Sequence, residues 1–258
     1  MKVVILAGGF GTRLGEYTQD IPKPMVTIGN EPIIMHIMRI YASYGFKDFV
    51  LALGYKGDVI RDYFVNYRTL QSNVSVNLKS GDFNFFDDGL LDWNVTLVDT
   101  GLNTQTGGRL RKLEPFIGAD PFMITYGDGL ANIDLQNLKI FHQSHGKILT
   151  ISAVRPTARF GELVIKGSKV ERFEEKPQLH QGWVNGGFMV ANHELLEVIG
   201  SDDVMLEREP MERLFKDNEL MAFKHDGFWQ CMDNKRDRDL LEELFVKGAP
   251  WKSEAGNG

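Results

Sequence analysis

The chain has little cysteine, no long apolar run and no excess of positive charge. A single cysteine, Cys231, among 258 residues excludes an internal disulfide and is typical of a reducing compartment. No apolar stretch approaches the ~20 residues that a bilayer-spanning helix needs, and the N-terminus lacks the pattern of a signal peptide. The formal net charge of −6 argues against a nucleic-acid-binding surface. These absences predict a cytoplasmic protein without a nucleic-acid or membrane partner.

The order of predicted elements indicates an α/β protein. Apolar strand-like runs alternate with helical patterns through the first half, as in Val3 to Leu6, Pro32 to Tyr44 and Phe49 to Leu53. After Ile148 the pattern changes, and residues 162–165 and 169–174 read as paired strands. We therefore expect a Rossmann-like fold, with a mostly parallel mixed sheet flanked by helices and small β additions. No linker rich in proline, glycine or serine divides the chain, so residues 1–258 are predicted to form a single domain.

A glycine-rich loop follows the first predicted strand. Residues 6–13 read Leu-Ala-Gly-Gly-Phe-Gly-Thr-Arg, and a lysine between two prolines follows at Lys23. The glycines can bring backbone N–H groups close to an anion, and Arg13 and Lys23 add positive charge at the same place. This pattern predicts a polyphosphate ligand, and a glycine-rich turn without a ligand is the alternative. The loop lacks the last glycine of a Rossmann fingerprint and the lysine of a Walker loop.

Two aspartates end strand-like runs that lie far apart in the sequence. Asp128 stands between glycines after residues 121–125, and Asp233 follows residues 228–232. The carboxyl ends of strands in an open α/β sheet are where ligands bind, and two carboxylates there can share one Mg²⁺. The alternatives are an Asp-Gly turn at Asp128 and a helix N-cap at Asp233.

The signature G-G-x-G-T-R-L followed by P-K-P resembles that of the sugar-1-phosphate nucleotidylyltransferases. These enzymes join a nucleoside triphosphate to a sugar 1-phosphate and release pyrophosphate. The resemblance implies catalytic roles for Arg13, Lys23 and Asp128, and a Mg²⁺ ion held by Asp128 and Asp233. The nucleotide-binding residues are predicted to be Leu6, Ala7, Gly8, Gly9, Gly11, Thr12, Arg13, Lys23, Thr104 and Arg109.

Two of these residues lie at the start of a predicted helix and in the loop before it. Arg109 follows Thr-Gly-Gly at the start of a predicted helix, where an arginine clamps phosphates or simply faces water. Thr104 lies in the preceding loop, within reach of a nucleotide base.

The second half of the chain supplies the sugar side in the resembling family, so residues 1–147 are predicted to bind the nucleotide and residues 148–252 the sugar. Lys176 lies in Glu-Glu-Lys-Pro, which matches the sugar-phosphate motif of the family. Its alternative is a surface ion pair. Asn185, Gly186 and Gly187 match the segment that lines the sugar pocket, although a bulged strand would read alike.

Longer stretches narrow the resemblance to the branch that makes CDP-glucose from CTP and α-D-glucose 1-phosphate. They comprise residues 93–101, 106–110, 125–129, 227–230, 232–233 and 248–252. From physical arguments alone a loop backbone can read cytosine, uracil or thymine, so UTP or dTTP is the alternative. A nucleotide-sugar-dependent glycosyltransferase and a non-catalytic nucleotide-binding module are the rival classes.

The family also assembles into homo-oligomers. The aromatic stretch from Ser80 to Asp92 reads equally as part of a subunit interface or as a hairpin folded on its own chain.

Overall fold

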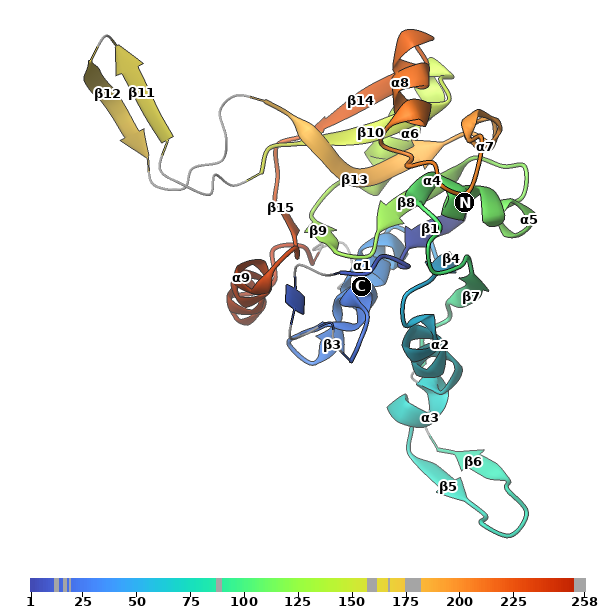
Figure 1. Ribbon diagram of the computed structural model, residues 1–258. Helices are drawn as coiled ribbons and strands as arrows, with labels where there is room; N and C mark the ends of the chain where they lie inside the picture. The colour runs from blue at the N-terminus through green and yellow to red at the C-terminus, as the bar shows by residue number, and fades with distance from the viewer. Residues whose placement is uncertain are drawn as a thin grey trace.

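A seven-stranded sheet forms the centre of the molecule (Figure 1). The computed structural model describes residues 1–11, 14–15, 18, 20–86, 90–156, 162–166, 168–174 and 182–252. Across the sheet the strands follow the order β14 (Leu220–His225), β10 (Leu149–Val154), β13 (Val184–Ala191), β8 (Phe122–Tyr126), β1 (Val3–Leu6), β4 (Asp48–Leu53) and β7 (Asn94–Asp99).

The sheet is mixed but mostly parallel, as predicted. Strand β1 pairs in parallel with both β4 and β8, and β4 and β10 pair in parallel with β7 and β14 respectively. Strand β13 is antiparallel to both of its neighbours, β10 and β8. In register, Leu6 lies beside Ala52 on one side and Tyr126 on the other. The carboxyl ends of β1, β4 and β8 therefore meet at one edge, where open α/β sheets bind ligands.

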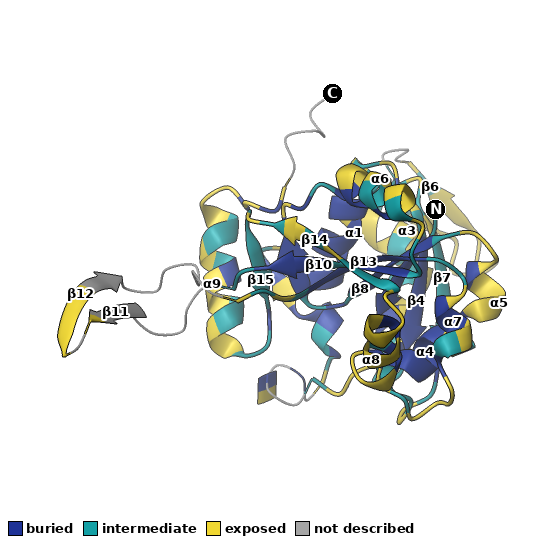
Figure 2. Cartoon of the chain, turned by 90° about the horizontal axis from the view of Figure 1, so that it is seen from above, coloured by how far each residue is buried: buried dark blue, intermediate teal, exposed yellow. Residues whose placement is uncertain are grey.

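Helices cover both faces of the sheet, so the central strands are apolar on both sides. The pleat sends Val3 and Ile5 into one hydrophobic cluster and Val4 and Leu6 into another. Figure 2 shows this core in dark blue between helices with exposed outer faces. The first cluster contains residues of α1 (Ile33–Ser43), α2 (Gly57–Val65), α6 (Leu135–His145) and α9 (Lys235–Val246). The second contains residues of α4 (Thr106–Lys112), α5 (Glu114–Ile117), α7 (Leu195–Val198) and α8 (Glu209–Lys216).

The predicted small β additions are antiparallel pairs. They are β2 (Thr27–Ile28) with β3 (Glu31–Pro32), β5 (Val74–Val76) with β6 (Phe83–Phe85), β9 (Gly129–Ala131) with β15 (Trp229–Cys231), and β11 (Glu162–Lys166) with β12 (Lys169–Glu174). The pairing of β11 with β12 confirms the strands expected there. Figure 1 shows that the β5–β6 and β11–β12 hairpins stand away from the body of the molecule.

The aromatic stretch from Ser80 forms one strand of a projecting hairpin. Short helix α3 (Tyr67–Gln71) leads into β5, and β6 follows a turn at residues 77–82. Phe83 stacks on Phe85, while Leu78, Phe83 and Phe86 are exposed.

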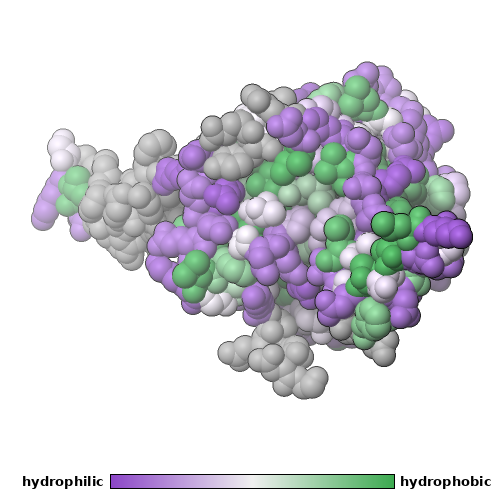
Figure 3. Space-filling model, turned by 90° about the horizontal axis from the view of Figure 1, so that it is seen from below, coloured by the Kyte–Doolittle hydropathy of each residue, from purple (hydrophilic) through white to green (hydrophobic). Residues whose placement is uncertain are grey.

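In the view from below, green hydrophobic patches are set in hydrophilic surface (Figure 3). None of the helices in the described ranges combines the length and apolarity that a membrane crossing requires.

Candidate active site

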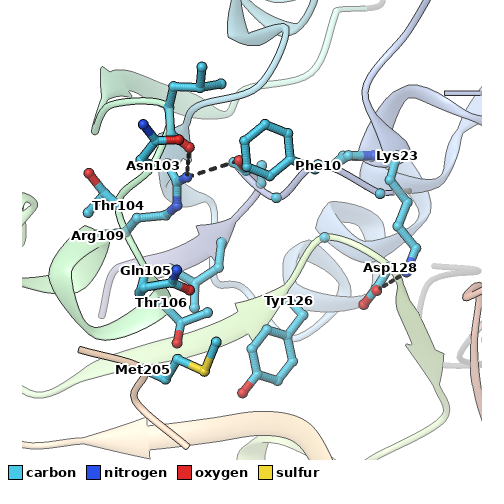
Figure 4. Close-up of a pocket in the computed structure, with 18 of the residues that line it drawn as sticks. Phe10, Lys23, Asn103, Thr104, Gln105, Thr106, Arg109, Tyr126, Asp128 and Met205 are labelled. Atoms are coloured by element: carbon cyan, nitrogen blue, oxygen red, sulfur yellow. Dashed lines mark hydrogen bonds and ion pairs between the residues drawn. The ribbon is translucent and has the colours of Figure 1, made fainter. Parts of the chain in front are cut away.

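A cavity of about 470 Å³ opens at the carboxyl edge of the sheet (Figure 4). It is bounded by the glycine-rich loop after β1, the loop from Leu102 to Thr106, and the turn after β8. The predicted nucleotide-binding and metal-binding residues in the described ranges all line it: Leu6, Ala7, Gly8, Gly9, Gly11, Lys23, Thr104, Arg109, Asp128 and Asp233. Thr12 and Arg13 lie outside the described residues, as does Lys176.

A second hollow of about 350 Å³ adjoins the first. It is lined by the predicted sugar-side residues Asn185, Gly186 and Gly187. Asp128, Asp233 and Tyr126 line both hollows. The two predicted halves of the site therefore meet at the two carboxylates.

Lys23 binds both carboxylates at this junction. Its Nζ lies 2.6 Å from Oδ2 of Asp128 and 2.8 Å from Oδ1 of Asp233. Lys23 begins the short 3-10 helix η2 (Lys23–Met25), and the flanking Pro22 and Pro24 restrict its backbone. The cluster joins residues 105 and 210 positions apart in the sequence.

A two-stranded ladder brings the two aspartates together. Strands β9 and β15 pair antiparallel with Gly129 opposite Cys231, and the N–H of Met232 donates to the carbonyl of Asp128 at 2.8 Å. The Asp233 N–H donates to Oδ2 of Asp237 at 3.0 Å. The N-cap interpretation of Asp233 is wrong, because Asn234 caps α9 and forms a capping box with Asp237. The Asp233 carboxylate lines the cavity and accepts a hydrogen bond from Lys23 there.

The charges of this cluster reinforce one another. Burial disfavours the ammonium of Lys23, but attraction to Asp128 and hydrogen bonds to both carboxylates outweigh it and raise the Lys23 pKa. The pKa of the neighbouring Cys231 thiol is also raised. Burial, followed by Asp233 and Asp128, raises the pKa of its thiol to about 12. Cys231 therefore stays neutral at physiological pH and is a poor nucleophile.

The donor set fits a hard divalent cation. Two carboxylates that can bind one ammonium can bring oxygen ligands to one Mg²⁺, which prefers such ligands. In the described ranges no group of three or more histidine, cysteine or acidic side chains forms a metal cluster. Two carboxylates with the remaining positions left to phosphate and water match the usual Mg²⁺ arrangement.

The sugar-side hollow contains polar residues that sequence reasoning missed. The hydroxyl of Tyr126 donates to Oε1 of Glu207, and the hydroxyl of Thr106 donates to Oε2 of Glu207 at 2.6 Å. The indole N–H of Trp229 donates to the carbonyl of Gly186 at 2.8 Å. Tyr126 directly precedes Gly-Asp-Gly and could have been found from that position, whereas nothing in the stretch around Glu207 identifies it.

The Asn185-Gly186-Gly187 segment needs its glycines for packing. Gly187 has φ +80°, and a Cβ there would lie 2.6 Å from the Tyr126 ring. Asn185 Oδ1 accepts a hydrogen bond from the Gly187 N–H at 2.9 Å, which fixes the turn. The segment lies in strand β13 and also lines the second hollow, so the two interpretations of it do not exclude each other.

Arg109 lines the cavity in an unexpected way. The water-facing alternative is wrong, since Arg109 is only 4% exposed. Burial lowers its pKa, and its Nη atoms donate to oxygens of the protein itself. Thr104 is similarly engaged, because its hydroxyl donates to the carbonyl of Thr100 at 2.6 Å. Asn103 and Gln105, on either side of Thr104, also line the cavity and were not predicted.

Comparison with known proteins places this geometry in a family. The family model described as "Nucleotidyl transferase" matches residues 2–230. Glucose-1-phosphate cytidylyltransferase of Salmonella typhimurium is 47% identical over 255 residues, covering 98% of this chain and 99% of that protein. The probable glucose-1-phosphate cytidylyltransferase of Bacillus subtilis is 38% identical over 254 residues, with the same coverage of 98% and 99%.

A solved structure shows the same fold. HddC from Yersinia pseudotuberculosis superposes with a TM-score of 0.68 at 26% identity, covering 95% of this chain and 99% of that one. The expected fold class is therefore confirmed. With a matching model over most of its length and full-length relatives well above 30% identity, the chain belongs to the nucleotidyl transferase family.

Proposed function

We propose that this chain transfers the cytidylyl group of CTP to α-D-glucose 1-phosphate, giving CDP-glucose and pyrophosphate. The observation that carries this choice of substrates is the full-length likeness to glucose-1-phosphate cytidylyltransferases, at 47% identity. The geometry supports the reaction class, because a cavity beside a glycine-rich loop meets a second hollow at two carboxylates. Two substrates bound in adjoining hollows would bring their phosphates to that junction.

The reaction requires alignment and charge neutralisation. A phosphate oxygen of the sugar phosphate attacks the α-phosphorus of CTP, and the bond to pyrophosphate breaks. The attacking phosphate monoester is already anionic, so no general base is needed. The residues of the site therefore act by holding two mutually repelling anions in line and by stabilising the charge that develops on the leaving group.

Asp128 and Asp233 are the residues that would hold Mg²⁺, since both already reach a single cation. When bound, the ion supplies positive charge to the phosphate oxygens. Lys23 lies at the same junction and, with its raised pKa, stays charged at neutral pH. It is proposed to stabilise the transition state and the leaving pyrophosphate together with Arg13. Lys176 is proposed to bind the phosphate of glucose 1-phosphate.

Assembly into a homo-oligomer is part of the proposal, with the β5–β6 hairpin among the contacts between copies of this chain. The hairpin stands off the body (Figure 1) and exposes Leu78 by 96%, Phe83 by 56% and Phe86 by 65%. Apolar side chains that a projecting element exposes to water are unfavourable, and contact with another subunit would bury them.

Pyrophosphate release is the direct test of the proposed function. The purified chain is incubated with glucose 1-phosphate, Mg²⁺ and one of CTP, UTP, dTTP or GTP, and released pyrophosphate is measured by a coupled assay. We expect the highest kcat/KM with CTP and no release when glucose 1-phosphate is omitted. Preference for another nucleotide would refute the base assignment, and absence of release with all four would refute the reaction class.

A further inference from the structure

One buried side chain connects the loops of three adjacent strands. Arg109 Nη2 donates to the carbonyl of Gly8 after β1 at 3.0 Å. Its Nη1 donates to the carbonyl of Leu53 at the end of β4 at 2.9 Å and to Thr100 Oγ1 after β7 at 2.6 Å. The same guanidinium also donates to the carbonyls of Gly101 and Leu102, at 2.9 and 3.3 Å. The residues that accept these bonds lie between 7 and 101 positions from Arg109 in the sequence.

The guanidinium is held by neutral oxygens. In the described part of the chain no carboxylate lies within ion-pair distance of it, although Asp99 attracts it at longer range. Its four Nη hydrogens face five protein acceptors. A phosphate could bind these hydrogens only by displacing carbonyl groups that fix the loops. The bonding is therefore that of a cross-link between loops rather than of an open phosphate clamp.

Two glycines leave the space that this guanidinium occupies. A Cβ on Gly8 would lie 2.2 Å from Nη1 of Arg109, and a Cβ on Gly54 would lie 2.4 Å from the same atom. Gly8 does not have a positive φ, so its missing side chain is explained by Arg109. Because a trans peptide points its C=O and the next N–H in opposite directions, holding the Gly8 carbonyl turns the Gly9 N–H away from Arg109. Gly9 is exposed and lines the cavity.

The opposite end of the cross-link reaches the loop on the other side of the cavity. The carbonyl of Leu102 accepts a hydrogen bond from Arg109, and the next residues, Asn103 to Thr106, line the cavity. Figure 4 shows Arg109 beside Asn103 and Thr104, with its guanidinium directed toward the loop that bears Phe10. The sugar-side hollow is lined by other residues, and Arg109 is not among them.

We propose that Arg109 is a positioning residue for the nucleotide, which fixes the glycine-rich loop and the 102–106 loop relative to each other without itself binding phosphate. The inference rests on the proposed function for its substrates. Loss of the cross-link lets the two walls of the nucleotide cavity shift, whereas Arg109 bonds none of the residues that line the sugar-side hollow. An error of about 1 Å in such a wall costs on the order of 100-fold in rate.

The test compares Arg109→Lys with Arg111→Lys. Lysine keeps the charge but cannot reproduce the planar fork of donors. Arg111 lies two positions along the same helix and is exposed, and its Nη1 donates to the carbonyl of Gly200 at 2.6 Å. We expect Arg109→Lys to weaken binding of CTP and of CMP by a similar factor of about tenfold or more in calorimetric titrations. The KM for glucose 1-phosphate should change by less than about twofold, and Arg111→Lys should match the unaltered chain.

Three results would overturn the proposal. Unchanged nucleotide affinity in Arg109→Lys would show that the cross-link is dispensable. Weaker CTP binding with unchanged CMP binding would make Arg109 a ligand of the outer phosphates. An equal rise in KM for both substrates would indicate a general scaffold role.

A second pair of variants covers the case in which Arg109→Lys does not fold. Thr100→Val retains Arg109 and removes the hydroxyl that accepts from it at 2.6 Å. It should weaken CTP and CMP together by about threefold, while unchanged binding of both would count against the proposal. Added ethylguanidinium should restore CTP binding to Arg109→Ala but leave Arg111→Ala unaltered. These titrations need no turnover, so a chain that fails to release pyrophosphate refutes the proposed function without deciding the role of Arg109.

Discussion

Replacing Lys23 by methionine should destabilise the protein and make its stability depend on Mg²⁺. The substitution removes an ammonium that lies 2.6 Å from Oδ2 of Asp128 and 2.8 Å from Oδ1 of Asp233, so these two oxygens are no more than about 5.4 Å apart. At an effective dielectric constant of about 20, two like charges at that distance repel by ~3 kcal/mol. The two side chains are 26% and 24% exposed, so solvent relieves part of this repulsion.

We therefore expect Lys23→Met to lower the free energy of unfolding by about 2 kcal/mol in EDTA. A divalent cation can replace the lost positive charge, so Mg²⁺ should restore part of that loss in the variant. In the unaltered chain Mg²⁺ must compete with the ammonium for the same oxygens, and the gain in stability should be smaller. Urea denaturation followed by circular dichroism, in EDTA and in millimolar Mg²⁺, measures both effects.

The control is Lys79→Met, which removes an exposed lysine from the projecting hairpin. It should change the free energy of unfolding by less than about 0.5 kcal/mol in either buffer. The reasoning fails if Lys23→Met is as mild as this control, or if Mg²⁺ stabilises the variant and the unaltered chain equally. A double-mutant cycle with Asp128→Asn would then show whether the ammonium and the carboxylate are coupled at all.

Four further predictions concern catalysis, acidity and assembly. Asp128→Ala should lower kcat by at least about 100-fold with little loss of fold, and substantial turnover at saturating Mg²⁺ would contradict its role. Lys176→Ala should raise the KM for glucose 1-phosphate far more than that for CTP, and an effect confined to CTP would remove the assignment. Burial lowers the pKa of His142 below 6.5, so the unfolded chain binds more protons in acid. As the pH decreases from 6.5, the free energy of unfolding should therefore fall by up to ~1.4 kcal/mol per pH unit for this group. Urea denaturation of His142→Asn over the same pH range should show a smaller dependence of that free energy on pH. Phe83→Ser combined with Phe86→Ser should reduce the mass found by light scattering, whereas an unaltered oligomer would exclude the hairpin from its contacts.

The sequence allowed the site to be predicted where chemistry is local. The glycine-rich loop, Lys23 between prolines, and the aspartates that end strands each carry a short pattern with a physical meaning. Because parallel strands end at one edge of a sheet, the glycine-rich loop after β1 and Asp128 after β8 could be expected in one place. Asp233 follows β15, which lies outside that sheet and pairs antiparallel with β9. The cavity lining confirms that they lie together, and their roles in binding and catalysis stay predictions.

Residues whose meaning depends on distant partners could not be read in the same way. Arg109 is buried because carbonyls from three loops surround it, and no pattern around Thr-Gly-Gly-Arg indicates those carbonyls. Strands β10 and β14 were not predicted. In β10 the polar side chains of Thr150 and Ser152 interrupt the apolar pattern, and they are buried because they bond His142 and the Phe188 N–H.

The ladder between β9 and β15 has a consequence for when the enzyme can become active. Asp233 is synthesised 105 residues after Asp128, and the two are joined through the bond from the Met232 N–H to the Asp128 carbonyl. During translation β1 and the glycine-rich loop are synthesised first, whereas Asp128 and Asp233 can be paired only once β9 and β15 have both been synthesised. We expect a chain truncated before β15 to lack turnover, because it lacks the second carboxylate. The two carboxylates can therefore come together only after residue 233 has been synthesised.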